Sequence, residues 1–173
     1  MIIQKGKKKI MTNTKKITFT AIGIALYVVL SMSMKIPLIA HISLDLGYIA
    51  FALYCYHFGA ISGMIVGGVG CILISLITTG WFPPGWFLGN LIIGVICGRL
   101  YRHNATISNI IITIIAVAIG ILGIKTVIEC KLYGIPYAVK IPKNAIAFIT
   151  DAAVMSVGTL FARDKTIERI CHE

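Results

Sequence analysis

The sequence has few charged residues: Asp, Glu, Lys and Arg together make up 13% of its 173 residues, against about 25% in ordinary soluble domains. Hydrophobic residues make up 58%, and the mean hydropathy is +0.92. This composition predicts an integral membrane protein. Because one transmembrane helix takes ~20 apolar residues, six helices would use about 120 residues and leave no room for a separate soluble domain.

The sequence also lacks the motifs of several enzyme and metal-binding classes. It has no G-x-x-x-x-G-K-[ST] phosphate loop, so any energy for transport must come from a source other than a built-in ATPase. Its five cysteines are odd in number and include no C-x-x-C pair, which supports neither a disulfide framework nor a zinc site. We expect them to be small packing residues, and we expect neither a metal nor a cofactor.

Six runs of uncharged or nearly uncharged residues predict six transmembrane helices. The second and fourth runs are shorter than a full span, and a tight turn is expected over Tyr56 to Gly59. The fold class predicted is therefore an all-α integral membrane protein, a bundle of six transmembrane helices. The runs are Ile17 to Met34, Leu44 to Phe58, Ala60 to Thr79, Trp86 to Gly98, Ile107 to Ile124 and Asn144 to Ala162.

The placement of basic residues predicts the orientation of this bundle. With six spans both termini lie on one side, which then carries eleven Lys and Arg residues against five on the other. Lys and Arg concentrate on the cytoplasmic side, so both termini are expected in the cytoplasm. The net charge of +10 then reflects topology rather than nucleic-acid binding. The predicted division is a basic tail over 1–16, a transmembrane domain over 17–162 and a cytoplasmic tail over 163–173.

Polar residues at membrane depth are candidates for ligand contact, because each costs free energy unless it is paired or hydrated. Asp45 opens the second span and Asn144 the sixth, where either could instead cap its helix. Asp151 follows Asn144 by seven residues and shares its face, although it could simply partner an internal hydroxyl or lysine. Trp86 and Asn90 share a face of the fourth span.

The predicted outer connections supply the other candidates. Residues 80–86 form an aromatic, proline-containing loop in which Trp81 or Trp86 could stack on a flat ligand, although Trp also anchors helices at the membrane interface. The connection from Lys125 to Lys143 is the longest predicted loop, and its basic residues favour a ligand with some negative character. Its candidate ligand residues are Lys125, Glu129, Lys131, Tyr137 and Lys143.

Small residues recur at four-residue spacing in two spans. The third predicted span contains Gly59, Gly63 and Gly67, and we expect this stripe to pack against another helix of the chain. The first predicted span contains a similar pair, Ala21 and Ala25.

With these motifs the sequence resembles the substrate-binding S components of energy-coupling factor (ECF) vitamin transporters. The likeness covers nearly the whole chain and includes the Ala21-x-x-x-Ala25 pair, the segment Phe58 to Gly68 and the segment Pro84 to Gly94. The resemblance implies a multi-pass protein of a prokaryotic cell membrane. It would capture a vitamin or related micronutrient at the outer face and dock on a T subunit driven by two ATP-binding subunits. It also implies that Ala21 and Ala25 contact the T subunit, and that the pocket is built from outer loops and the outer halves of the last three helices.

Two other functions fit parts of the sequence. Asp45 and Asp151 could form the carboxylate pair of an intramembrane enzyme, which would require contact between them. A self-sufficient small-solute transporter is the third alternative, although such folds commonly contain internal repeats.

Overall fold

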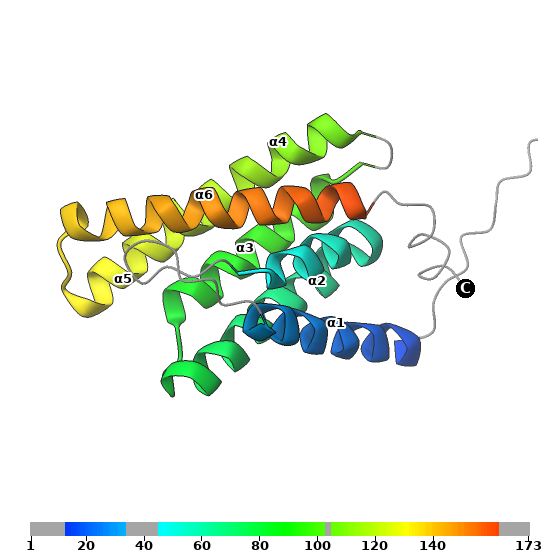
Figure 1. The fold of residues 1–173 in the computed structure, drawn as a ribbon, viewed down its shortest axis with the longest axis horizontal. Helices are drawn as coiled ribbons and strands as arrows, with labels where there is room; N and C mark the ends of the chain where they lie inside the picture. Colours follow the sequence, from blue (N-terminus) through cyan, green and yellow to red (C-terminus); the bar gives the residue numbers. More distant parts are fainter. Residues whose placement is uncertain (1–12, 34–44, 103–104, 163–173) are drawn as a thin grey trace, which may run out of the picture.

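The computed structural model describes residues 13–33, 45–102 and 105–162, and the regular structure in these ranges is entirely helical (Figure 1). The all-α prediction is thus confirmed. Most of both predicted tails, and a further predicted outer loop over residues 35–43, lie outside the described residues. The elements are α1 (Asn13–Ser33), α2 (Gly47–Thr79), α3 (Pro84–Leu100), α4 (Thr106–Val117), the π-helix η2 (Ala118–Lys125), α5 (Thr126–Tyr133) and α6 (Tyr137–Phe161).

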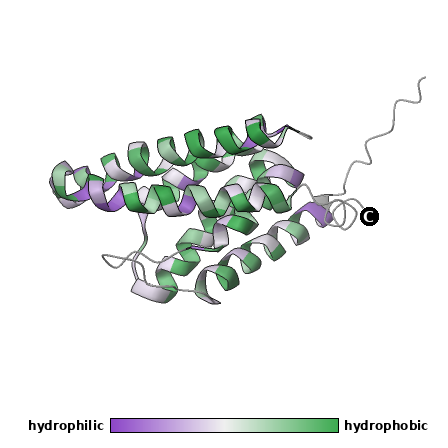
Figure 2. Ribbon diagram, turned by 45° about the horizontal axis from the view of Figure 1, so that its top comes forward, coloured by the Kyte–Doolittle hydropathy of each residue, from purple (hydrophilic) through white to green (hydrophobic). Residues whose placement is uncertain are grey.

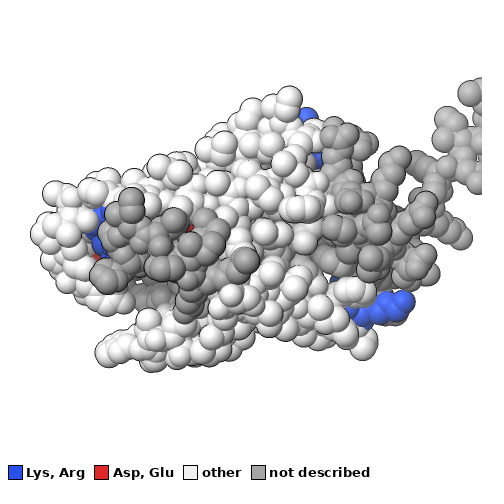
Figure 3. All heavy atoms as spheres, in the orientation of Figure 1, with Lys and Arg blue, Asp and Glu red and all other residues white. Residues whose placement is uncertain are grey.

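The helices are long and apolar, and they expose hydrophobic side chains, as in a membrane protein. Four helical stretches, Thr14–Ser33, Gly47–Thr79, Thr106–Tyr133 and Tyr137–Phe161, are long and apolar enough to cross a membrane, and α3 is a shorter apolar helix. Hydrophobic residues cover most of the ribbon in Figure 2. On the face shown in Figure 3, Lys and Arg lie near the two ends of the long axis. Apolar side chains such as Ile61 and Ile107 are about three-quarters exposed, as expected of a surface that faces lipid.

Helix α2 is broken at Gly59, whose backbone has φ 78° and ψ −166°. Glycine adopts this conformation without the steric penalty that a side chain would bring. The two arms, residues 47–58 and 60–79, then run back alongside each other, with Gly63 facing Cys55 and Gly67 facing Phe51. The turn predicted over Tyr56 to Gly59 is confirmed.

The second arm of α2 packs closely against α3 through glycines on both helices. Gly94 lies against the backbone of Met64, and Gly98 lies against the backbone of Ala60. Gly63 in turn faces the carbonyl oxygen of Gly94. The predicted role of the Gly59, Gly63 and Gly67 stripe in packing within the chain is therefore confirmed.

The expected long loop from Lys125 to Lys143 is instead helical. Helix α4 continues through η2 into α5, so one helical stretch runs from Thr106 to Tyr133. Gly134, with φ 63°, ends α5, and α6 begins only three residues later at Tyr137. The sequence interpretation was wrong because it ended each helix where the apolar residues ended. Backbone hydrogen bonds continue a helix into the polar membrane interface.

The ends of the elements define two ends of the bundle. In Figure 1 the beginning of α1 and the end of α6 lie at one end of the long axis, and α5 and the beginning of α6 lie at the other. Helix α1 packs mainly on α2, whereas α6 packs on α2, α4, η2 and α5. The buried core between them includes Tyr27, Tyr48, Phe51, Ile93 and Met155.

Candidate functional site

A hydrogen-bonded group centred on Tyr48 joins both arms of α2 to α3. Tyr48 is fully buried. Its hydroxyl accepts a hydrogen bond from Nε1 of Trp86 at 3.2 Å and donates one to Oδ1 of Asn90 at 2.9 Å. The side-chain nitrogen of Asn90 donates to the carbonyl oxygen of Gly67 at 3.1 Å. Because Trp86 and Asn90 are four residues apart on α3, one tyrosine can contact both.

Asp45 lies just before α2 and ties it to α1. Its Oδ1 accepts hydrogen bonds from the Ser31 hydroxyl and from the backbone N–H of Gly47, the latter at 2.9 Å. The Tyr27 hydroxyl donates to Oδ2 at 3.4 Å. Burial raises the pKa of the Asp45 carboxyl above its usual range, and these three hydrogen bonds act in the opposite direction. The bond from Gly47 satisfies a backbone N–H of the first turn, but Asp45 is not the cap residue that the sequence allowed, because the N-cap of α2 is Leu46 and makes no side-chain capping hydrogen bond.

Lys125 and Asp151 complete this group from the other side of the bundle. The Lys125 ammonium lies 5.6 Å from the centroid of the Trp86 ring, a cation–π geometry. Lys125 is the last residue of η2, and π-helical turns inside α-helices occur frequently at functional sites. Asp151 is buried in the middle of α6, where it interacts electrostatically with Asp45, Lys125 and Tyr48.

We call these residues the Tyr48 cluster. It contains Tyr27, Ser31, Asp45, Tyr48, Trp86, Asn90, Lys125 and Asp151. An indole, phenols, an amide, carboxylates and an ammonium group there offer ring surfaces beside hydrogen-bonding and charged groups. In the three described stretches of chain, no group of three His, Cys, Asp or Glu residues is placed to hold a metal ion.

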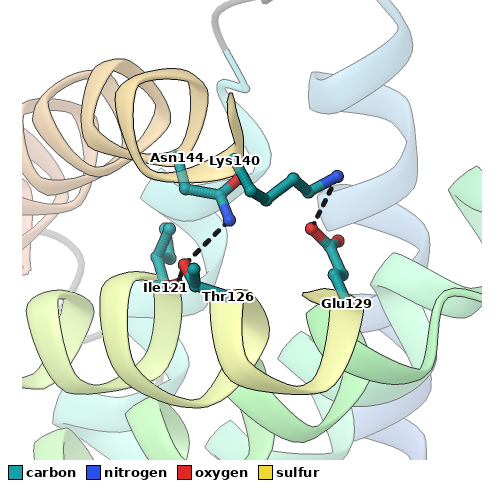
Figure 4. Close-up of polar contacts among 5 residues, drawn as sticks. All are labelled: Ile121, Thr126, Glu129, Lys140 and Asn144. Carbon is teal, nitrogen blue, oxygen red and sulfur yellow. Dashed lines mark hydrogen bonds and ion pairs between the residues drawn. The ribbon is translucent and has the colours of Figure 1, made fainter. Parts of the chain in front are cut away.

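Two predicted site residues instead tie α6 to the η2–α5 stretch. Figure 4 shows Asn144 donating from Nδ2 to the Thr126 hydroxyl at 2.9 Å, while that hydroxyl donates to the Ile121 carbonyl oxygen at 2.9 Å. In the same view Glu129 forms an ion pair with Lys140 at 2.9 Å. Both pairs hold the α5–α6 hairpin together.

The remaining predicted site residues lie at the surface. Trp81 is 78% exposed and follows α2, outside the Tyr48 cluster. Lys131, Tyr137 and Lys143 are exposed on or beside the α5–α6 hairpin. The structure therefore brings together Asp45, Trp86, Asn90, Lys125 and Asp151 from the predicted set.

Sequence reasoning missed the residue at the centre of the cluster. Tyr48 follows Asp45 by three residues within an apolar span, and this spacing was the available signal. Tyr27 and Ser31 are likewise four residues apart on one face of α1. Nothing in the sequence connected them to Asp45, because their contact depends on how α1 packs against α2.

Comparison with known proteins identifies the family. A family model described as "ECF-type riboflavin transporter, S component" matches residues 11–157, which is most of the chain. The chain belongs to this family. The ECF S component is a substrate-binding transport subunit and not an enzyme, which confirms the resemblance drawn from the motifs and removes the intramembrane-enzyme alternative.

The chain is also similar to bacterial proteins named UPF0397 protein. One from Lactobacillus johnsonii is 26% identical over 164 residues, covering 87% of this chain and 88% of the relative. One from Lactobacillus acidophilus is 31% identical over 149 residues, covering 83% of this chain and 71% of the relative. One from Streptococcus thermophilus is 32% identical over 84 residues, covering 49% of this chain and 46% of the relative. The chain thus spans about half the length of the Streptococcus relative that it matches.

Proposed function

We propose that this S component captures a flat heteroaromatic micronutrient, with riboflavin as the first candidate, at the outer face of a prokaryotic cell membrane. It then delivers the ligand to a T subunit driven by two ATP-binding subunits. The family description supports riboflavin as the ligand class to test first. The absence of a phosphate-binding loop from the sequence supports an external energy source.

The observation that carries this proposal is the Tyr48 cluster itself. Through Tyr48 of α2 it brings together the partly buried Trp86 ring and the buried Asn90 amide of α3, and the buried Asp151 side chain of α6 interacts with the same tyrosine. Ring stacking would contribute roughly 0.5 to 1.5 kcal/mol beyond area burial, and each hydrogen bond to the ligand ~1 kcal/mol. Several such contacts on rigid helices suffice for tight capture, since nanomolar affinity corresponds to about 12 kcal/mol.

The proposed topology has six membrane-spanning segments and cytoplasmic termini. The reversal at Gly59 supports counting the two arms of α2 as separate segments, and α3, with 17 residues, is about 25 Å long. The beginning of α1 and the end of α6 share one end of the bundle (Figure 1), which an even number of segments requires. The excess of basic residues at that side supports its cytoplasmic placement.

Two surfaces complete the proposal. Ala21 and Ala25 are exposed on α1, which supports their use as the contact surface for the T subunit. At the opposite end we assign the exposed side chains of Trp81, Lys131, Tyr137 and Lys143 to the rim of the binding site. Glu129 and Asn144 support the site by holding the α5–α6 hairpin.

The decisive experiment measures riboflavin binding to the detergent-purified protein by calorimetry and by quenching of flavin fluorescence. Wild-type protein should bind, Trp86→Ala should weaken binding at least tenfold, and Trp81→Ala should weaken it less. Mass spectrometry of the small molecule that co-purifies with the protein provides an independent identification. A co-purifying ligand without an aromatic ring, together with no riboflavin binding, would refute the proposal.

A further inference from the structure

The last turn of the π-helix η2 is closed by Thr126. The backbone N–H of Thr126 donates to the carbonyl oxygens of Gly123 and Ile121, and the second of these lies five residues earlier in the chain. The Thr126 hydroxyl also donates to the Ile121 oxygen, at 2.9 Å. In an α-helix the N–H would bond four residues back, and a threonine hydroxyl three or four residues back. The two bonds to Ile121 therefore mark the π register.

Asn144 of α6 fixes the direction of the hydroxyl bond. Its side-chain nitrogen donates to the Thr126 hydroxyl oxygen at 2.9 Å, as Figure 4 shows. Because a hydroxyl has one proton, Thr126 can accept from Asn144 and still donate to Ile121. Thr126 and Asn144 are each only 2% exposed, so water cannot readily replace either bond. The π turn is thus tied to α6 by a buried chain of two hydrogen bonds.

Packing against α3 explains why this stretch takes an extra residue. A methyl group on Gly89 would lie 2.7 Å from the carbonyl oxygen of Gly120. A methyl group on Gly85 would lie 3.0 Å from the carbonyl oxygen of Lys125. The two α3 glycines are four residues apart, whereas their partners in η2 are five residues apart. An α-helix presents residues three or four apart on one face, and a π-helix accommodates the additional residue.

The π register also decides where the Lys125 side chain points. Lys125 is the last residue of η2 and directly precedes Thr126, and its ammonium lies 5.6 Å from the centroid of the Trp86 ring. A change from the π to the α register would rotate the following residues by about 100° relative to the preceding ones, because an α-helix has about 3.6 residues per turn. The ammonium would then leave the ring. Because π-helices are rare and mostly limited to single turns, the register depends on contacts with other helices.

Building on the proposed capture function, we infer that Thr126 and Asn144 are positioning residues of the binding site. They hold η2 in the π register and so keep the Lys125 ammonium at the Trp86 ring. When a flat ligand stacks on this ring, the ammonium donates a hydrogen bond to a carbonyl oxygen at the edge of the ligand. Thr126 and Asn144 act on the ligand only through Lys125.

The first test of this inference needs no ligand. The sequence has two tryptophans, so Trp81→Phe leaves Trp86 as the only one, and its emission spectrum reports the surroundings of that ring. In this background Lys125→Met should shift the emission maximum of the folded protein, because it removes a positive charge close to the indole. Thr126→Val should shift it in the same direction, and it should add little when Lys125 is already methionine. Thr126→Ser keeps the hydroxyl and should retain the parent spectrum.

Thr159→Val is the matched control, because Thr159 is also buried and its hydroxyl donates to a carbonyl oxygen of its own helix, that of Ser156, at 2.7 Å. It should leave the emission unchanged. Asn144→Leu should shift the emission in the same direction as Thr126→Val, and it carries the test if Thr126→Val does not fold. An unchanged spectrum in Lys125→Met or in the positioning variants, or shifts that simply add in the double variants, would overturn the inference.

A riboflavin titration then connects the position of Lys125 to binding. Lys125→Met should weaken binding roughly tenfold, as expected for the loss of one hydrogen bond to a charged group. Thr126→Val should also weaken binding, and the double variant should bind no more weakly than Lys125→Met alone. Thr126→Ser should retain the wild-type affinity.

The two measurements separate this inference from the choice of ligand. If the wild-type protein does not bind riboflavin, the proposed ligand is wrong, and the emission spectra still decide whether Thr126 and Asn144 position Lys125. If riboflavin binds equally well to the wild type and to Thr126→Val, the positioning role in binding is overturned and riboflavin capture stands.

Discussion

Gly94 of α3 lies directly against the backbone of Met64 in the second arm of α2: a methyl group on Gly94 would come within 2.7 Å of the Met64 nitrogen and 2.8 Å of its Cα. Neither atom can move without displacing the helix. In a membrane, where helices gain little from the hydrophobic effect, such backbone proximity is a main source of association. The hairpin at Gly59 and its packing on α3 therefore depend on glycine.

We predict that Gly94→Ala destabilises the protein by roughly 1 to 3 kcal/mol, because the added methyl group overpacks a rigid interface. Gly123→Ala is the matched control, since among the described residues no atom outside its own stretch of helix lies within 4 Å of the position that its methyl group would occupy. It should be neutral or slightly stabilising. Thermal unfolding in detergent, followed by circular dichroism, measures both. Equal melting temperatures would show that the α2–α3 interface can relax.

Tyr48→Phe should destabilise the protein by roughly 1 to 3 kcal/mol and weaken ligand binding. It removes the hydroxyl that accepts from Trp86 and donates to Asn90, and so leaves one partly buried and one buried polar group without this partner. Tyr133→Phe, at a residue that is 55% exposed, is the control and should have no effect. Chemical denaturation and the tryptophan emission spectrum report the change. An unaltered emission maximum in Tyr48→Phe would indicate that Trp86 is not hydrogen-bonded in solution.

The ion pair and the hydrogen bond across the α5–α6 hairpin should differ in how their coupling energies respond to salt. A double-mutant cycle with Glu129→Gln and Lys140→Met should give a coupling energy of up to about 1 kcal/mol that declines as salt is added, because both side chains are partly exposed. A cycle between Asn144→Leu and Thr126→Val should give about 0.6 kcal/mol with little salt dependence, because that pair is buried. Salt-independent coupling of Glu129 and Lys140 would contradict this assignment.

Ala21→Trp or Ala25→Trp should impair assembly with the energising subunits and uptake into cells, while ligand binding to the isolated protein stays intact. Both alanines are exposed on α1, so a large side chain is tolerated by the fold but holds a partner helix away. Ile149→Trp, on a residue of α6 that is 63% exposed, controls for a bulky group on a lipid-facing surface. Co-purification with a tagged T subunit is the measurement. Loss of ligand binding in the isolated variants would show that the alanines pack within the chain.

A reporter fused to the C-terminus should be active only in the cytoplasm, because the side that holds the ends of the chain carries eleven basic residues against five. A reporter inserted after Gly134, between α5 and α6, should report the outer side. Signals from the opposite compartments would refute the six-segment topology.

The helical class, the approximate positions of the apolar segments and the turn at Gly59 could all be predicted from the sequence. These features follow from local properties, namely runs of apolar residues, the conformational freedom of glycine and the four-residue spacing of small side chains. The same local rules failed at Lys125, where the chain stays helical beyond the last apolar residue. Charge marks where a helix leaves the hydrocarbon core, and it does not end the backbone hydrogen bonding.

The sequence by itself also identified five members of the Tyr48 cluster as candidate ligand residues: Asp45, Trp86, Asn90 and Asp151 in the predicted spans, and Lys125 in a predicted outer loop. Only the tertiary structure decided which of the candidates meet. Asp45 is tied to Ser31 through the packing of α1 on α2, Lys125 reaches Trp86 from the end of η2, and Asn144 pairs with Thr126. These contacts join residues 14 to 39 positions apart, and they depend on the relative rotation and depth of whole helices. A single sequence contains no periodicity that specifies that arrangement, because it results from the packing of all the helices together.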